Sequence, residues 1–136
     1  MKKVFIDSEI ARLFPSGFLE TELQKHPNVL GVERNRDLTE RSPAFWHVRE
    51  KIIFINPGIN GAELLDKLEK NLRMPLSITP EESWIFVFCH ELHHSDGDYT
   101  ESECDFFAAK RLRELRVEAA EIERRKRLRR LMAYVP

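Results

Sequence analysis

The chain has 136 residues, of which 42% are hydrophobic and 33% charged, and its formal net charge is −1. This balance predicts one domain, residues 1–136, with a buried core. No apolar run reaches the roughly 18 residues that a membrane-spanning helix needs. Two cysteines cannot build a disulfide framework, and the start, Met1-Lys2-Lys3, lacks the apolar region of a secretion signal. We therefore expect a cytoplasmic protein.

Short apolar runs separated by turn residues fill the first part of the chain. They predict a strand at 3–6, a helix that begins at Asp7-Ser8, a second helix at 18–25 and a strand at 28–34. The polar stretch 35–43 predicts a loop. These elements are short, and none carries a motif of known chemistry.

Two β-rich runs follow, at 45–48 and 51–55. They predict a hairpin, although Arg49-Glu50 is not a favoured turn pair. A helix with a leucine stripe should begin at Asn60 and end at Met74-Pro75. The chain thus predicts an α+β protein with a small, mostly antiparallel sheet.

A third helix has a well-defined start. Thr79 is a good N-cap, Pro80 suits the first helical position, and Glu82 completes a capping box. Residues 84–88 are apolar on every side, so this helix should be buried. We expect it to end near Ser95, before a turn at 96–98.

The last helix should be long and change character along its length. Thr100 and Glu103 form a second capping box, and the helix should run from Glu101 to Met132. Residues 110–136 hold ten Lys and Arg against four Glu, so the rest of the chain is negative. Residues 118–136 are expected to form a projecting basic tail. Such a run is typical of a solvated helix end, and contact with nucleic acid is the alternative.

An H-E-x-x-H motif lies in the buried helix, at His90, Glu91 and His94. Positions four apart share a helix face, so the two histidines can hold one metal ion. Glu91 stands beside them, placed to polarise a water molecule. This pattern is typical of a catalytic Zn²⁺ site.

A third ligand is needed, and the next helix offers acidic residues. Glu103 is occupied by its capping box, which leaves Glu101 as the preferred ligand, with Asp96 and Asp98 as alternatives. Asp105, one turn beyond Glu101, is placed to accept the second ring N–H of a ligating histidine.

Other polar residues near the motif have weaker assignments. His93 faces away from the histidine pair and is expected to be exposed or on the substrate side. Tyr99, in the turn, is a candidate donor to an oxyanion or a substrate, and packing in the turn is the alternative. Cys89 and Cys104 are expected to be small buried hydrophobic residues, and metal ligation is the alternative for both.

These motifs resemble the gluzincin metallopeptidases, in which H-E-x-x-H is followed by E-x-x-x-D on the next helix. The segment ESECDFFAA at 101–109 is most similar to the ImmA/IrrE-type peptidases, and minigluzincins are also similar. The resemblance covers about residues 50–112. Cys104 stands where the family usually has Ala, and the link at 95–100 is shorter than in most relatives.

The resemblance implies a zincin-like fold and hydrolysis of peptide bonds by metal-activated water, with Glu91 as general base. It also implies that one hairpin strand binds an extended peptide, and the equally weighted alternative is that both are core strands. The expected partners are a peptide or protein substrate, and possible regulatory proteins. A silent metal-binding regulatory protein, or one associated with nucleic acid, is the alternative. The apolar end, 131–136, is a candidate inhibitory segment that folds back into the cleft.

Overall fold

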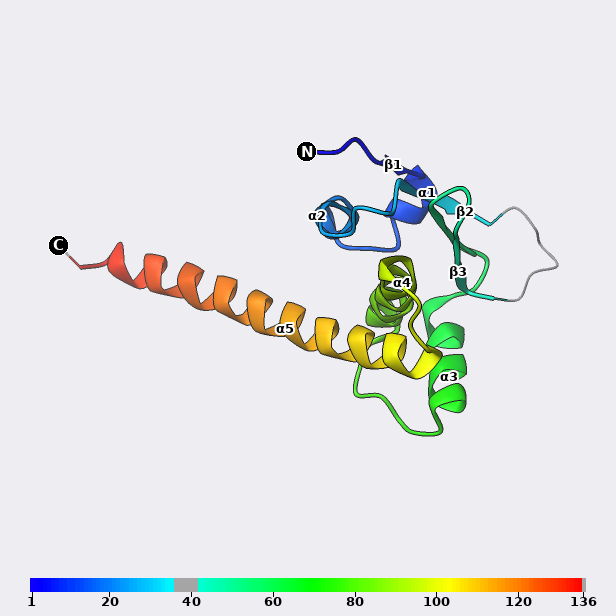
Figure 1. Ribbon diagram of the computed structural model, residues 1–136. Coiled ribbons are helices and arrows are strands. Elements are labelled where there is room, and N and C mark those ends of the chain that lie inside the picture. Colours follow the sequence, from blue (N-terminus) through cyan, green and yellow to red (C-terminus); the bar gives the residue numbers. More distant parts are fainter. Residues whose placement is uncertain (36–41, 136) are drawn as a thin grey trace.

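A computed structural model describes residues 1–35 and 42–135 (Figure 1). The expected loop at 35–43 lies mostly outside the described residues. The helices are α1 (Ser8–Ala11), α2 (Phe18–Gln24), α3 (Gly61–Leu72), α4 (Pro80–Asp96) and α5 (Glu101–Met132). The strands are β1 (Phe5–Ile6), β2 (Gly31–Arg34), β3 (Ala44–His47) and β4 (Ile52–Ile55). The α+β class and the long last helix are as predicted.

The strands form one sheet in the order β1-β2-β4-β3. The predicted hairpin is confirmed, because β3 and β4 pair antiparallel. The expectation of a mostly antiparallel sheet is wrong, since β2 pairs in parallel with both β1 and β4. The helices between β1 and β2 make a crossover long enough for parallel pairing. The hairpin then puts β4 beside β2 and leaves β3 at the edge.

The hairpin turn explains why Arg49-Glu50 is acceptable there. The loop has four residues, 48–51, and Lys51 adopts a left-handed conformation with φ of 58°. Its N–H donates to the carbonyl of His47 at 2.9 Å. Neither Arg49 nor Glu50 therefore needs the positive φ of a two-residue turn.

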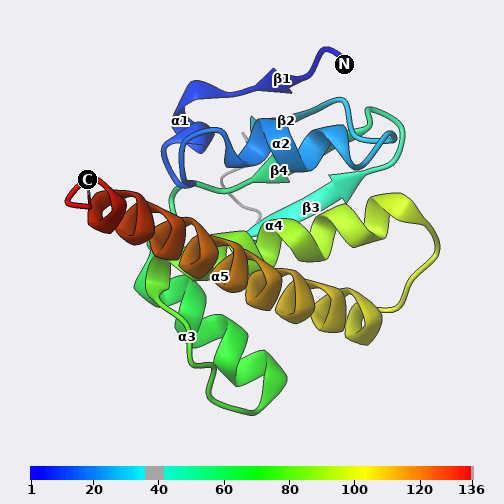
Figure 2. The same ribbon diagram turned by 90° about the vertical axis from the view of Figure 1, so that its left-hand side faces the viewer.

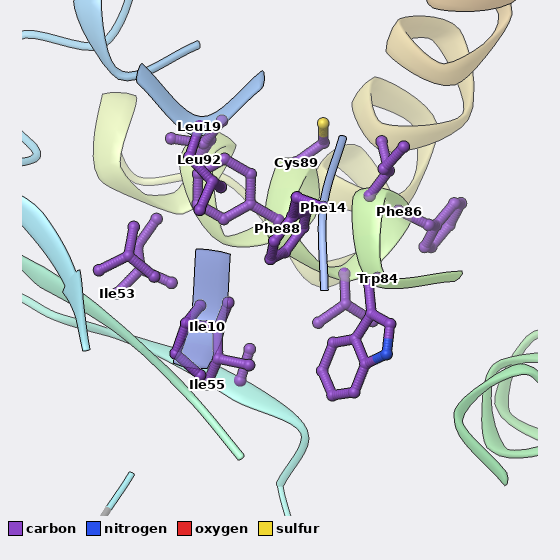
Figure 3. Packing of buried hydrophobic residues seen from close by; sticks show 14 of the residues in the cluster. Ile10, Phe14, Leu19, Ile53, Ile55, Trp84, Phe86, Phe88, Cys89 and Leu92 are labelled. Atoms are coloured by element: carbon purple, nitrogen blue, oxygen red, sulfur yellow. The ribbon is translucent and has the colours of Figure 1, made fainter. Parts of the chain in front are cut away.

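Helix α4 is the centre of the fold. It lies between the sheet on one side and α3 and α5 on the other (Figure 2). Phe88 is fully buried, and its ring meets Phe14 and Phe18 at 5.5 and 6.0 Å (Figure 3). Burial of one such ring contributes about 1.5–3 kcal/mol. The apolar stretch predicted to be buried on all sides is confirmed.

Both predicted capping boxes are present. The Thr79 hydroxyl accepts from the N–H of Glu82 at 3.1 Å, and the Glu82 carboxylate accepts from the N–H of Thr79 at 2.9 Å. Thr100 and Glu103 make the same pair of bonds, both at 3.2 Å. Arg116 of α5 also donates to Glu82, which lowers the pKa of that carboxyl to about 2. The start of α4 is therefore tied to α5.

A buried ion pair joins α2 to α5. Arg111 donates to both carboxylate oxygens of Glu22, at 2.6 and 3.1 Å, and these residues are 9% and 2% exposed. This bidentate geometry raises the pKa of Arg111. The pair is 89 positions apart in the sequence, and the sequence analysis did not predict it.

The C-terminal half of α5 leaves the body of the protein (Figure 1). Beyond Arg116 every described side chain is exposed except that of Glu121, which is half-buried. Tyr134 and Val135 are 87% and 72% exposed at the far end. The expectation that this end folds back into a cleft is wrong for the residues described, because the continuous helix carries it away. None of the described helices has the length and apolar character to cross a membrane.

Replacing Arg111 with Met should lower the free energy of unfolding by about 3–5 kcal/mol, because the buried Glu22 carboxylate loses its bidentate partner and keeps only the half-exposed Lys25, 3.5 Å away. Denaturant titration measures this loss. The double variant Glu22→Leu/Arg111→Met should lose much less than the sum of the two single variants. Additive losses would show that the pair is not coupled.

Candidate metal centre

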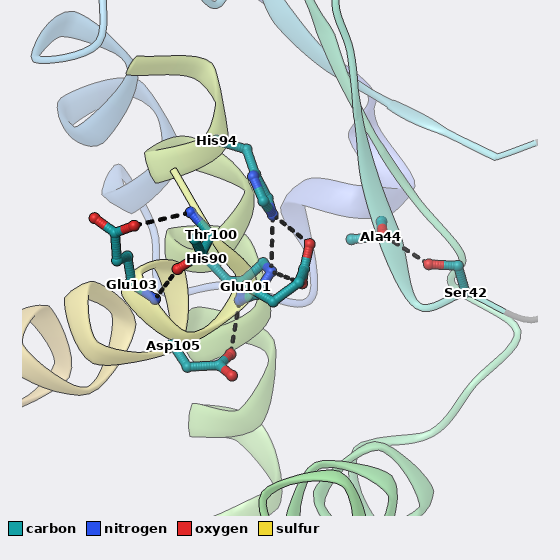
Figure 4. A network of polar contacts seen from close by, with 8 residues as sticks. All are labelled: Ser42, Ala44, His90, His94, Thr100, Glu101, Glu103 and Asp105. Atoms are coloured by element: carbon teal, nitrogen blue, oxygen red, sulfur yellow. Dashed lines mark hydrogen bonds and ion pairs between the residues drawn. The ribbon is translucent and has the colours of Figure 1, made fainter. Parts of the chain in front are cut away.

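Three side chains converge where α4 ends and α5 begins (Figure 4). The Nε2 atoms of His90 and His94 lie 3.2 Å apart. The Glu101 carboxylate approaches both, with Oε2 at 2.9 Å from His90 Nε2 and Oε1 at 2.9 Å from His94 Nε2. Two imidazoles and one carboxylate thus point at a common centre. The sequence predicted these three residues as one ligand set.

The local fold accounts for this convergence. His90 and His94 are one turn apart on α4, whose apolar sides fix the helix in the core. The connection to α5 is only four residues long, 97–100, and the Thr100 capping box fixes the first turn of α5. Glu101 is the first residue of that turn, so the cap sets its direction.

Asp105 lies one turn further along α5 and contacts His90. Its Oδ1 atom accepts a hydrogen bond from His90 Nδ1 at 2.7 Å. A carboxylate in this position fixes the ring orientation and leaves Nε2 free as a ligand. The geometry matches the supporting role predicted for Asp105.

Cys104 is a second candidate ligand, a role that the sequence analysis considered but placed below that of a small buried residue. It is fully buried, and one donor atom each from His90, His94 and Cys104 all lie within 4.8 Å of one another. The Glu101 oxygens are closer, at 2.9 Å from both imidazoles. Burial, together with nearby carboxylates, also raises the pKa of the Cys104 thiol to about 12. Because its carboxylate oxygens lie close to both imidazoles, we favour Glu101 as the third ligand.

Glu91 occupies a different environment from its neighbours. Burial raises the pKa of its carboxyl to about 7, and the charge of Glu101 adds to this rise. The charge of His90 and a hydrogen bond from the Trp46 N–H act in the opposite direction. A carboxyl with a pKa near neutrality can both accept and release a proton at that pH.

The site opens into a cleft between α4 and β3. One hollow of about 440 Å³ extends toward α3, where Leu68 and Asn71 line it. A second, of about 510 Å³, extends toward Trp46 and Tyr99. Both hollows share one set of lining residues: Ser42, Ala44, Glu91 and Glu101. The candidate ligands therefore lie midway along one elongated cleft.

The wall formed by β3 is the free edge of the sheet among the described strands. The carbonyls of Pro43 and His47 accept bonds from residues flanking β4, so the backbone groups of Ala44 and Trp46 alternate to the outer side. The Ser42 hydroxyl donates to the outward carbonyl of Ala44 at 2.8 Å (Figure 4). The sequence predicted the strand but could not show which of its edges is free.

Other predicted candidates lie elsewhere. His93 stacks between Tyr99 and Phe107, at 3.9 and 4.4 Å, and is not among the described residues that line the cleft. Asp96 is held by His26, whose Nδ1 lies 2.9 Å from its carboxylate. Tyr99 and Asp98 do line the cleft. Tyr99 therefore stays a candidate substrate contact, and His93 does not.

Comparison of the chain with protein-family models, with curated proteins and with solved structures finds no match. The functional argument consequently depends on the motif and on the geometry of this site.

Two variants one residue apart should separate capping from metal binding. Without metal, Thr100→Ala should lower the free energy of unfolding by about 0.5–2 kcal/mol, because α5 loses its cap. Glu101→Ala should change it by less than about 0.5 kcal/mol, since this side chain is 78% exposed. Denaturant titration in a chelating buffer measures both. Equal losses would mean that Glu101 has a structural role.

Proposed function

We propose that this chain is a zinc-dependent metallopeptidase of the gluzincin type, similar to the ImmA/IrrE-type peptidases. The observation that carries the proposal is the convergence of His90 Nε2, His94 Nε2 and the Glu101 carboxylate within 3.2 Å of one another. Zincin-like architecture is part of the proposal, supported by a motif helix beside the free edge of a small sheet.

The three donors suit Zn²⁺. Ligands at about 2.0–2.2 Å in tetrahedral geometry are separated from one another by about 3.3 Å. The observed separations of 2.9 and 3.2 Å are close to this value, so small side-chain shifts suffice. Imidazole and carboxylate are ligands that catalytic zinc sites use, and three protein ligands leave one position for water.

A zinc ion held there supplies Lewis acidity, which polarises the scissile carbonyl and makes water more acidic. Glu91 is the residue of the chain that transfers protons during hydrolysis. Its carboxylate takes a proton from the attacking water and delivers it to the leaving amine nitrogen. Asp105 keeps the His90 ring in place through Nδ1.

An extended peptide is the substrate shape that best fits the cleft. The outward N–H of Ala44 and the outward C=O of Trp46 offer backbone partners along β3, as in strand addition. The two hollows on either side of Glu91 would then receive side chains from both sides of the cleaved bond. Phe86 and Leu72 make one hollow partly apolar.

We expect the purified chain to bind about one zinc ion, measured by elemental analysis after dialysis. Asp105→Asn should weaken zinc binding about 10–100-fold, and Glu101→Ala should weaken it more, since a ligand itself is lost. Glu103→Gln, which keeps an acceptor for the capping bond, and Cys104→Ala should leave the affinity unchanged. Zinc should also raise the thermal midpoint of the wild type by mass action. Failure of the wild type to bind zinc would refute the proposed centre.

Glu91→Gln should keep its zinc and lose peptide hydrolysis by at least about 10²–10⁴-fold, because the amide cannot accept the proton. A mixture of unstructured peptides is a suitable probe, because mass spectrometry identifies the cleavage products. Glu103→Gln, the same change in a capping residue, is the matched control and should keep its activity. Undiminished hydrolysis by pure Glu91→Gln protein would contradict the mechanism.

A regulatory metal-binding protein without peptidase activity is the second candidate, favoured by the position of Cys104. If its thiol fills the fourth position, no site for water remains. Cobalt substitution distinguishes the two, because a thiolate ligand adds an intense near-ultraviolet absorption band. We expect the wild-type and Cys104→Ala spectra to be alike; a band lost in the variant would support the regulatory candidate.

A further inference from the structure

The projecting half of α5 carries an ordered row of side chains that the metal site does not use. Val117, Leu128 and Leu131 are 65, 43 and 64% exposed. With Glu121 and Arg124 they form the series 117, 121, 124, 128 and 131 within α5. The spacing alternates between four and three residues, which is the pattern of a coiled-coil seam.

This row faces away from the rest of the protein. The side chains that pack α5 onto the body include Ala108, which is fully buried, and Leu112, which is 5% exposed. At 3.6 residues per turn they lie roughly half a turn from Val117 and Leu128. A second helix can therefore lie along the row without meeting α4.

We propose that a second copy of this chain docks along this row, with the two α5 helices antiparallel. An alignment centred between residues 122 and 123 places Val117 of each copy against Leu128 of the other. It also places Glu121 of each copy against Arg124 of the other. The inference is independent of the proposed peptidase activity.

Charge complementarity selects this occupant and this direction. The antiparallel alignment puts the basic stretch 124–130 of one copy beside Glu118 and Glu121 of the other. A parallel alignment would instead put Arg124 on Arg124 and the two basic stretches together, which is repulsive. Within one chain Glu121 already accepts from Arg124 at 2.7 Å. In the dimer, Glu121 and Arg124 of both copies would form a ring of alternating charges. A polar pair of this kind in a coiled-coil seam fixes the register of the two helices.

A nucleic-acid backbone fits the same helix less well. The six basic residues between 124 and 130 point in all directions around the helix instead of forming one face. The row also presents Val117, Leu128 and Leu131, which a phosphate backbone would leave exposed to water.

Sedimentation equilibrium of the full chain tests the proposal. The wild-type mass should rise from 16.1 kDa toward twice that value with concentration. Leu128→Asp should weaken the dimer about tenfold or more. Ile122→Asp is the matched control: Ile122 is 53% exposed on the same helix but lies on the opposite side, so the dimer should persist. Circular dichroism checks that both variants keep their helix.

Charge reversal tests the register. Glu121→Arg and Arg124→Glu should each be monomeric alone, and a mixture of the two should form a heterodimer. For direction, Val117→Cys and Leu128→Cys should cross-link when mixed but not separately, and the native cysteines are fully buried. A wild type that stays at 16.1 kDa at every concentration, or cross-linking by either single variant alone, would overturn the proposal. Tight binding of a short DNA duplex that Leu128→Asp abolishes, without any dimer, would also overturn it.

Discussion

The packing of the first turns of α5 against α4 is the constraint on which the site depends. His90 and His94 come from one helix and Glu101 from the other, so their convergence requires a fixed angle between the two helices. Three features hold that angle. Ala108 and Leu112 pack into the core, the Thr100 capping box sets the first turn, and Arg116 reaches back to Glu82 at the start of α4. A four-residue connection leaves little freedom to depart from it.

The parts of this arrangement that local chemistry dictates could be predicted from the sequence. Capping boxes are set by residues three apart, and the histidine pair by a spacing of four, so both are visible without a structure. Excluding Glu103 because it caps a helix favoured Glu101 as the third ligand and left Asp96 and Asp98 as alternatives. The buried character of α4 followed from its apolar residues alone.

The features that the sequence did not predict depend on contacts between segments that are distant in the sequence. Parallel pairing of β2 with β4, and the free edge of β3, follow from strand order, which the short strands do not encode locally. Glu22 and Arg111 each look like ordinary surface charges until α2 is placed against α5. Cys104 was read as a small core residue because nothing in its neighbours shows that its helix face turns toward the histidines. His93 was misplaced because its stacking partners, Tyr99 and Phe107, come from the turn and from α5.

The positions of the two tryptophans have a practical consequence. Trp84 is 3% exposed in the core, whereas Trp46 is half-buried on the edge strand, where its backbone N–H donates to the Glu91 carboxylate. A small polar quencher in solvent should therefore reach the emission of Trp46 before that of Trp84. A ligand in the cleft should change the surroundings of the Trp46 indole, whereas those of the Trp84 indole should stay the same. The protein thus contains its own optical reporter of what enters the site, together with an internal reference.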